Sequence, residues 1–307
     1  MNKEERIQKF LHRVQIEDLS PLYLENLIQM ARKEDLEGEG LSVRPDTVGD
    51  VTSAVLNRDG VGRGRLNARE NQVVCGIPWV PMILNAYETR LEFVPSAKDG
   101  ASVATGDSLG IITGPVTTLL MAERVLLNFL QFLSGIATET RKYVDALGQS
   151  STRLLDTRKT TPGYRMLQKY AVACGGGYNH RLGLFDRVTL KDNHLAANDS
   201  QSGEPLTELV NRSKEQNPNL LIEVEVDHLE QIPAVLKAGP DKIMLDNFSI
   251  EELQQAVALI GDQACTEATG GITLETLPEL GNLGLDFIST GALVHKASWV
   301  DIGLDWE

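Results

Sequence analysis

Three polar segments dominate the middle of the chain: DTRKTTPG at residues 156–163, CGGGYNHR at 174–181 and VTLKDNH at 188–194. Arg158 and Lys159 closely follow the apolar pair Leu154-Leu155, and polar side chains at the end of a short strand are where α/β proteins build their sites. Residues 156–194 hold seven lysines or arginines against three aspartates, a local charge of +4 in a chain of formal charge −14. Because clustered cations repel one another, we expect this region to face a small polyanion. The acidity of the whole chain argues against a nucleic-acid partner.

After residue 147, apolar strand-like runs alternate with helical stretches. The runs lie at 153–156, 188–190, 220–226, 242–245, 264–268 and 287–289, and helices are predicted at 204–216, 229–237 and 250–260. This alternation indicates a parallel sheet covered by helices. Right-handed crossovers let such strands close into a barrel, but the periodicity alone also allows a doubly wound sheet.

The first half of the chain has a different pattern. Apolar residues recur at helical spacing up to about residue 33, and residues 34–51 have the glycine and proline content of a loop. Strand-like runs at 65–69, 72–76, 91–94, 102–104 and 109–112, with a helix near 80–87, predict a small α+β domain. Residues 117–147 predict one long helix, or two helices with a break at Gly135.

Composition favours a cytoplasmic protein without a membrane partner. Cys75, Cys174 and Cys265 lie far apart and form no C-x-x-C pair, which argues against a disulfide framework or a zinc site. No apolar signal core follows the first residues. The most apolar run, residues 119–133, contains charged and amide side chains, among them Arg124, and predicts a core helix rather than a membrane span.

Polar residues follow each predicted strand of the second half, and a barrel places all of these strand ends on one rim. They are Arg158, Lys159, Lys191, Glu225, Asp246, Thr269-Gly270-Gly271 and Thr290-Gly291-Ala292. We expect the two glycine turns to precede helices, from Ile272 and Leu293 onward, and to bind phosphate through backbone N–H groups. Two carboxylates at such a rim can hold ligand hydroxyl groups, hold Mg²⁺ through water, or stabilise a glycosyl cation. Because Glu223 lies on the same strand face as Glu225, either could be the site carboxylate.

The set DTRKTxPG, GGGxxHR and KDNH, in this order, resembles the quinolinate phosphoribosyltransferase family, and the resemblance covers nearly the whole chain. It implies an α/β fold, with an N-terminal α+β sandwich domain at 1–130 followed by an incomplete parallel α/β barrel at 131–307. The last residues are expected to return to the N-terminal domain. The implied reaction transfers a phosphoribosyl group to quinolinate and releases carbon dioxide.

The resemblance also implies roles for single residues. Lys159, Lys191, Glu225 and Asp246 are the expected catalytic residues. Quinolinate and pyrophosphate are expected to contact Arg124, Thr157, Arg158, Lys159, His180, Arg181 and Lys191, and the phosphoribosyl group the two carboxylates and the turns at Thr269–Gly271 and Thr290–Ala292. Mg²⁺ is expected to arrive on phosphoribosyl pyrophosphate rather than at a protein metal site. The resemblance further implies a homodimer with a shared active site, or a hexamer of three dimers, in which Arg124 enters the neighbouring subunit's site.

The residues themselves leave other interpretations open. Arg124 could be a surface arginine whose stem packs on the helix, and His180 could be a core histidine, while His194 is taken as structural. A lysine at a barrel strand end could form a Schiff base, as in a barrel lyase. A paralogue acting on another base, or an anion-binding protein without catalysis, has the same pattern.

Overall fold

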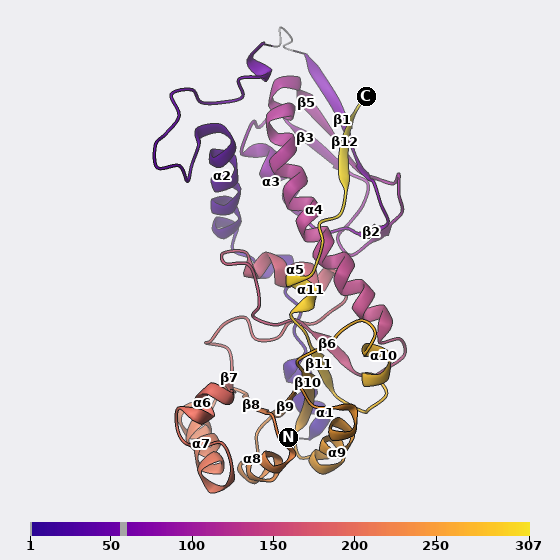
Figure 1. Cartoon of the computed structure of the whole chain (residues 1–307). Coiled ribbons are helices and arrows are strands. Elements are labelled where there is room, and N and C mark those ends of the chain that lie inside the picture. The colour runs from indigo at the N-terminus through magenta and orange to yellow at the C-terminus, as the bar shows by residue number, and fades with distance from the viewer. Residues whose placement is uncertain (1, 56–59) are drawn as a thin grey trace. The chain divides into compact units, whose positions relative to one another are not determined.

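The computed structural model describes residues 2–55 and 60–307 (Figure 1). These residues form two compact units. The sheet unit comprises residues 14–139, 173–176 and 297–307, and the barrel unit comprises residues 2–13, 140–172 and 177–296.

The sheet unit is built on a four-stranded antiparallel sheet in the order β12-β1-β5-β3. The C-terminal strand β12 pairs with β1, from Gly64 opposite Trp306 to Ala68 opposite Ile302. Its elements are α2 (Pro21–Glu37), β1 (Val61–Ala68), β2 (Gln72–Val73), α3 (Val80–Asn85), β3 (Glu92–Pro95), β4 (Ser102–Val103), β5 (Ser108–Pro115), most of α4 (Val116–Ala146) and β12 (Ile302–Trp306).

Helix α4 runs without a break, which confirms the first of the two predicted arrangements, one long helix, and excludes a break at Gly135. A Cβ at Gly135 would lie 2.2 Å from the Ser298 carbonyl oxygen. The glycine therefore admits the C-terminal segment against the helix, and does not end it. By length and composition α4 could cross a membrane, contrary to our expectation, but 61% of its most apolar window is buried inside the protein. That burial is typical of a core helix.

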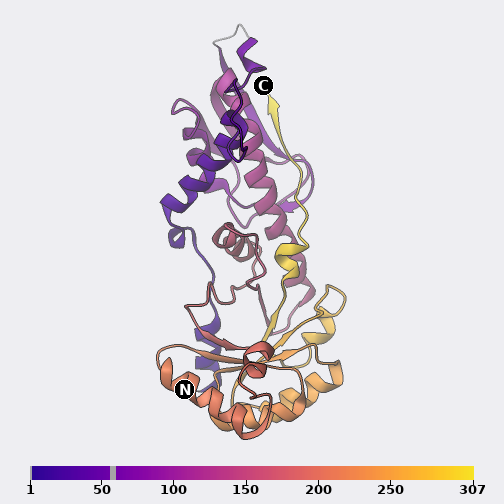
Figure 2. The same ribbon diagram turned by 60° about the vertical axis from the view of Figure 1, so that its left-hand side comes forward.

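The barrel unit contains six parallel strands in the order β6-β11-β10-β9-β8-β7. Figure 2 shows its orange helices in an arc along one side of these strands. Neighbouring strands follow chain order from β7 to β11, and β6 pairs with β11, so the order contains no reversal of the doubly wound kind. The sheet is a barrel left open between β6 and β7, which confirms the predicted fold class. Its elements are α1 (Lys3–Phe10), β6 (Arg153–Leu155), α5 (Arg165–Cys174, whose last residues belong to the sheet unit), β7 (Val188–Leu190), α6 (Asp192–Ala196), α7 (Gly203–Gln216), β8 (Ile222–Val226), α8 (Ile232–Ala238), β9 (Lys242–Asp246), α9 (Ile250–Ile260), β10 (Cys265–Thr269), α10 (Leu277–Leu280), β11 (Phe287–Ser289) and α11 (Ala292–His295).

The first helix belongs to the barrel unit. The expected N-terminal domain, at 1–130, includes this helix, so the two divisions of the chain differ here. Ile7 and Phe10 of α1 are buried against Cys265 and Phe287, the first residues of β10 and β11. The α1 helix therefore covers the amino-terminal end of the barrel. Periodicity shows that this segment is a helix with an apolar face, but not which core that face fills.

Candidate active site

A cavity of about 640 Å³ lies at the carboxyl ends of the barrel strands. All six strands contribute to it, either with their last residues or with the turn that follows. Fourteen of the fifteen predicted site residues line it: Thr157, Arg158, Lys159, His180, Arg181, Lys191, Glu225, Asp246, Thr269, Gly270, Gly271, Thr290, Gly291 and Ala292.

Two segments that supply cations to the cavity are fixed by a buried polar network around Asp156. This carboxylate accepts hydrogen bonds from Lys169 Nζ (2.7 Å), Asn179 Nδ2 (2.9 Å) and the His180 N–H (2.7 Å). Lys169 also donates to the His180 carbonyl at 3.1 Å. Asp156 and Lys169 are both fully buried, so the network positions the residues that follow Asp156 and Asn179 without touching solvent.

The cations of the cavity crowd one another. Burial, and then the like charge of Arg158, lower the pKa of the Arg181 guanidinium. The Nε atom of Arg158 is buried and has no hydrogen-bond partner among the described residues. Guanidinium groups held together in this way are poorly compensated and favour an anionic ligand, which planar carboxylates match bidentately.

The two carboxylates of the cavity differ in their partners. Glu225 forms an ion pair with Lys191, and Asp246 accepts a hydrogen bond from Asn247 Nδ2 at 2.9 Å. Burial raises the pKa of Glu225, opposed by Lys191 and reinforced by the charge of Asp246. The two carboxylates therefore influence each other electrostatically across the cavity.

Glu223 does not line the cavity. It is fully buried and bonded to Lys242 (2.8 Å), Arg187 (3.1 Å) and the Thr189 hydroxyl (2.7 Å). Burial alone would raise the pKa of Glu223, but Lys242, His180 and Arg187 outweigh it and lower the pKa to about 2. The strand thus places Glu225 at the cavity and Glu223 in the interior of the barrel.

His180 joins the cavity to this interior network. Its Nδ1 accepts the Arg181 N–H at 2.8 Å. Its Nε2 faces Glu267 Oε1 at 3.5 Å and Glu223 Oε2 at 3.8 Å. The ring is 6% exposed, so His180 lines the cavity and is also a largely buried histidine held by carboxylates.

The glycine turn after β10 is conformationally demanding. Gly270 and Gly271 have φ of +81° and +61°, in the left-handed region that side chains disfavour. A Cβ at Gly270 would lie 2.2 Å from Asn247 Oδ1. No helix begins at Ile272, contrary to expectation, because the next helix, α10, starts at Leu277. Consecutive left-handed residues still form an anion-binding concavity.

The turn after β11 leads directly into α11 at Ala292, one residue before the predicted start. Two of its N–H groups already have acceptors: Thr290 donates to the Leu155 carbonyl at 3.1 Å, and Ala292 donates to the Thr290 hydroxyl at 3.2 Å. A Cβ at Gly291 would lie 2.8 Å from Lys159 Cδ and 2.9 Å from His295 Nδ1. Gly291 is therefore required for the close approach of these side chains.

Sequence reasoning missed eight residues of the lining. Six of them belong to a strand or to the segment just after it, so a rule that took neighbours of the predicted strand ends would have found most of them, whereas the other two lie at the end of α11. The missed residues are Thr189, Met244, Asn247, Ile272, Thr273, Ser289, His295 and Lys296. His194, taken as structural, accepts the Lys191 N–H on Nδ1 at 3.0 Å in the first turn of α6.

Arg124 is the one predicted site residue that does not line the cavity. It is exposed on α4 within the single chain, so it is not a buried arginine of this chain's own core. Leu126, Leu127 and Leu130 are at most 3% exposed within the chain, and Phe129 is 8% exposed. These residues fill the protein's own core, so they supply no argument for a second subunit.

Comparison with known proteins agrees with this geometry. The profile of the quinolinate phosphoribosyl transferase C-terminal domain matches residues 136–305, and that of the N-terminal domain matches residues 50–134. A probable nicotinate-nucleotide pyrophosphorylase (carboxylating) of Bacillus subtilis is 38% identical over 84% of this chain and 88% of its own. The Mycobacterium leprae nicotinate-nucleotide pyrophosphorylase (carboxylating) is 38% identical over 91% and 95%.

A solved structure is similar over almost the same length. The nicotinate-nucleotide pyrophosphorylase from Francisella tularensis superimposes with a TM-score of 0.86 at 33% identity, covering 96% of this chain and all of that one. Both domain profiles, the relatives and this structure lead to the same assignment: the chain belongs to the quinolinate phosphoribosyl transferase family.

Proposed function

We propose that this protein transfers the phosphoribosyl group of phosphoribosyl pyrophosphate to quinolinate and releases pyrophosphate and carbon dioxide, giving nicotinate mononucleotide for NAD synthesis. The observation that carries the proposal is the composition of the cavity. Arginines and lysines, two carboxylates and a glycine turn with left-handed backbone meet at the carboxyl ends of six parallel strands. The family relatives bear the name of this activity.

The cationic segments suit the two carboxylates of quinolinate. Arg158 and Arg181 supply planar guanidinium groups that bind carboxylates bidentately. The His180 ring accepts a hydrogen bond from the Arg181 N–H and so helps to fix the Arg181 backbone. Lys159 and Lys191 supply point charges for the pyrophosphate. The turns at Thr269–Gly271 and Thr290–Ala292 take the 5-phosphate of the ribose through backbone N–H and hydroxyl groups.

In the first step the pyridine nitrogen forms a bond to C1 of the ribose while the C1–oxygen bond breaks. The electron pair leaves with pyrophosphate, whose charge the lysines stabilise. Positive charge develops on the ribose ring. Glu225 and Asp246 stabilise that charge, as carboxylates do in glycosyl transfer.

Decarboxylation follows from the quaternised nitrogen. The bond between C2 and its carboxyl group breaks, carbon dioxide leaves, and the electron pair stays on C2 next to the positive nitrogen. A solvent proton then replaces the carboxyl group. In this step the cavity has to hold the pyridine ring and exclude competing anions. The arginines do both by binding the 3-carboxylate that remains on the ring.

We propose that Mg²⁺ enters on the phosphates of phosphoribosyl pyrophosphate, as part of the substrate. Glu225 and Asp246 offer the oxygen atoms that Mg²⁺ prefers, and they line the same cavity as the phosphate-binding turns. We also propose a cytoplasmic homodimer in which Arg124 of one subunit reaches the partner's cavity. The exposure of Arg124 and its place outside its own chain's cavity lining support that arrangement.

Base selection tests the proposal. Purified protein is incubated with phosphoribosyl pyrophosphate, Mg²⁺ and either quinolinate or nicotinate, and pyrophosphate release is measured. Quinolinate should react and nicotinate should not, because a base without the 2-carboxylate leaves buried cations unpaired. Equal turnover of both bases would assign the cavity to a different phosphoribosyl acceptor. Borohydride trapping of a lysine adduct would point instead to Schiff-base chemistry.

A further inference from the structure

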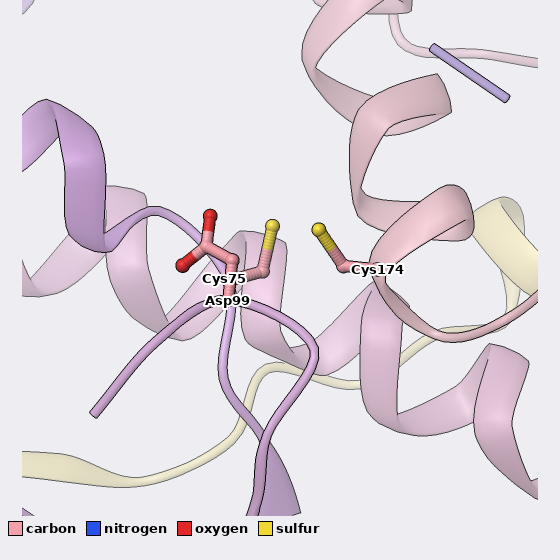
Figure 3. A group of neighbouring side chains, drawn as sticks. All are labelled: Cys75, Asp99 and Cys174. Atoms are coloured by element: carbon pink, nitrogen blue, oxygen red, sulfur yellow. The ribbon is translucent and has the colours of Figure 1, made fainter. Parts of the chain in front are cut away.

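Two cysteines far apart in sequence meet in the sheet unit, outside the cavity described above. Cys75 follows β2, Asp99 lies between β3 and β4, and Cys174 is the last residue of α5. Figure 3 shows both thiols projecting to the same side, with the carboxylate of Asp99 beside Cys75. The two Sγ atoms and a carboxylate oxygen all lie within 4.8 Å of one another.

The Asp99 carboxylate is oriented before any ligand arrives. Its oxygens accept the N–H groups of Gly76 (3.0 Å) and Ile77 (2.9 Å), the two residues directly after Cys75. Hydrogen-bonded carboxylates of this kind are typical of metal ligands, because the outer bonds fix the ligand and raise its affinity.

The backbone of Cys75 is fixed equally well. Its N–H donates to the Ser134 hydroxyl at 2.9 Å, and that hydroxyl donates back to the Cys75 carbonyl at 3.2 Å. Hydrogen bonds between Gly100 and Val74 (2.8 Å) and between Val74 and Ala101 (2.9 Å) join the loop of Cys75 to the loop of Asp99. The relative positions of these two ligands therefore do not depend on a bound ion.

We propose that Cys75, Asp99 and Cys174 form a binding site for a soft divalent cation of the Zn²⁺ class. Two thiolates and a carboxylate provide three of the four ligands of a tetrahedral Zn²⁺ site, with a water molecule in the fourth position. Sulfur ligands select Zn²⁺ or Cd²⁺ over Mg²⁺, so this site is distinct from the Mg²⁺ that accompanies the substrate. The ion holds the end of α5 to the loops of Cys75 and Asp99.

A disulfide between Cys75 and Cys174 is the chemical rival. Both cysteines are free thiols in this structure, and Cys75 is fully buried. The carboxylate beside the thiols also has no part in a disulfide, whereas it compensates the charge of a cation.

The test measures binding of Cd²⁺ alone to full-length protein that has been stripped with chelator and kept reduced. Thiolate-to-Cd²⁺ charge-transfer absorption should saturate at one ion per chain, Zn²⁺ should displace it, and a large excess of Mg²⁺ should not. Zn²⁺ should also raise the thermal unfolding midpoint, because it binds the folded state in preference.

Three variants make the assignment specific. Cys174→Ser removes a thiolate from a partly exposed position and should weaken Zn²⁺ binding by more than about a hundredfold, beyond the usual effect of losing an outer partner. Asp99→Asn should weaken it by at least about tenfold. Cys265→Ala is the matched control, since Cys265 is a buried thiol of the barrel unit, and its Zn²⁺ affinity should equal that of the parent.

Several results would overturn the proposal. They are absence of stoichiometric Cd²⁺ binding to the parent protein, Zn²⁺ affinity unchanged in Cys174→Ser, or affinity lost in Cys265→Ala. Loss of two titratable thiols when reductant is removed, reversed by dithiothreitol but prevented by Cys174→Ser, would assign the pair to a disulfide instead.

Discussion

Lys242 should be the most stability-critical charge of the barrel interior. It is fully buried, lies 2.8 Å from Glu223 and is also paired with Glu267. In the variant Lys242→Met, Glu223 still has an ion pair with Arg187 at 3.1 Å. Of the ion pairs that Glu267 forms with the described residues, only the contact with the His180 ring at 3.5 Å remains. One buried carboxylate thus loses its main compensation, which costs about 3–5 kcal/mol of unfolding free energy.

The pH dependence supplies a second signature. The pKa of Glu223 is lowered from 4.5 to about 2. The ionised carboxylate therefore contributes its full stabilisation of the folded state above pH 4.5, and this stabilisation is lost as the pH falls toward 2. The linked stability is roughly 3 kcal/mol. Without Lys242 the carboxylates protonate more easily, and the stability difference between parent and variant should narrow as the pH drops below 4.5.

Urea unfolding followed by circular dichroism measures both effects. The matched control is Lys237→Met, because Lys237 pairs with Glu204 and both side chains are 62% exposed, where an ion pair contributes little. The double variant Lys242→Met/Glu267→Gln should recover part of the loss, since it removes the uncompensated charge. A Lys242→Met variant as stable as the control, or a stability difference that does not change with pH, would refute this account of the interior network.

Four further outcomes are expected. Lys159→Ala should lose about 1.5–3 kcal/mol of interaction with a charged ligand, roughly ten- to a hundredfold in rate or binding; unchanged kinetics would place it outside the site. Mixing inactive Arg124→Ala with inactive Lys159→Ala subunits should restore at most about a quarter of intact sites in a two-fold dimer, and no recovery despite proven exchange would confine Arg124 to its own chain. Gly270→Ala should raise the KM for phosphoribosyl pyrophosphate more than that for quinolinate, because its Cβ would meet Asn247 Oδ1 at 2.2 Å; equal effects would argue against a phosphate role. Because burial raises the pKa of Glu225 and the ionised form is required, kcat/KM should fall on the acid side at a pH above 4.5, and that limb should vanish in Glu225→Gln; an acid limb that persists in this variant would assign it to another group.

The sequence predicted the barrel and its rim because both depend on local order along the chain. Each of the six strand predictions coincides with an observed strand, and a parallel barrel necessarily brings the following polar residues together. For the same reason Glu225 and Asp246 could be placed in the cavity, whereas the choice between Glu223 and Glu225 required the depth of each residue within the barrel.

Features that depend on distant packing could not be predicted. Gly135 left open whether residues 117–147 form one helix or two, because its role depends on Ser298, which lies more than 150 residues away. Arg124 lies in the most apolar run of the chain, and the residues left open whether it lies at the surface; the structure places it on the exposed side of the helix. Cys75 and Cys174 showed no metal-ligand spacing, since their proximity arises only from the fold.

The most direct measurement for the central claim is the stoichiometry of carbon dioxide and pyrophosphate release. Quinolinate labelled with ¹³C in the carboxyl group next to the ring nitrogen is turned over with phosphoribosyl pyrophosphate and Mg²⁺. We predict one labelled carbon dioxide for each pyrophosphate, with the unlabelled 3-carboxylate retained in nicotinate mononucleotide. Pyrophosphate release without labelled carbon dioxide, or label remaining in the nucleotide product, would contradict the proposed reaction.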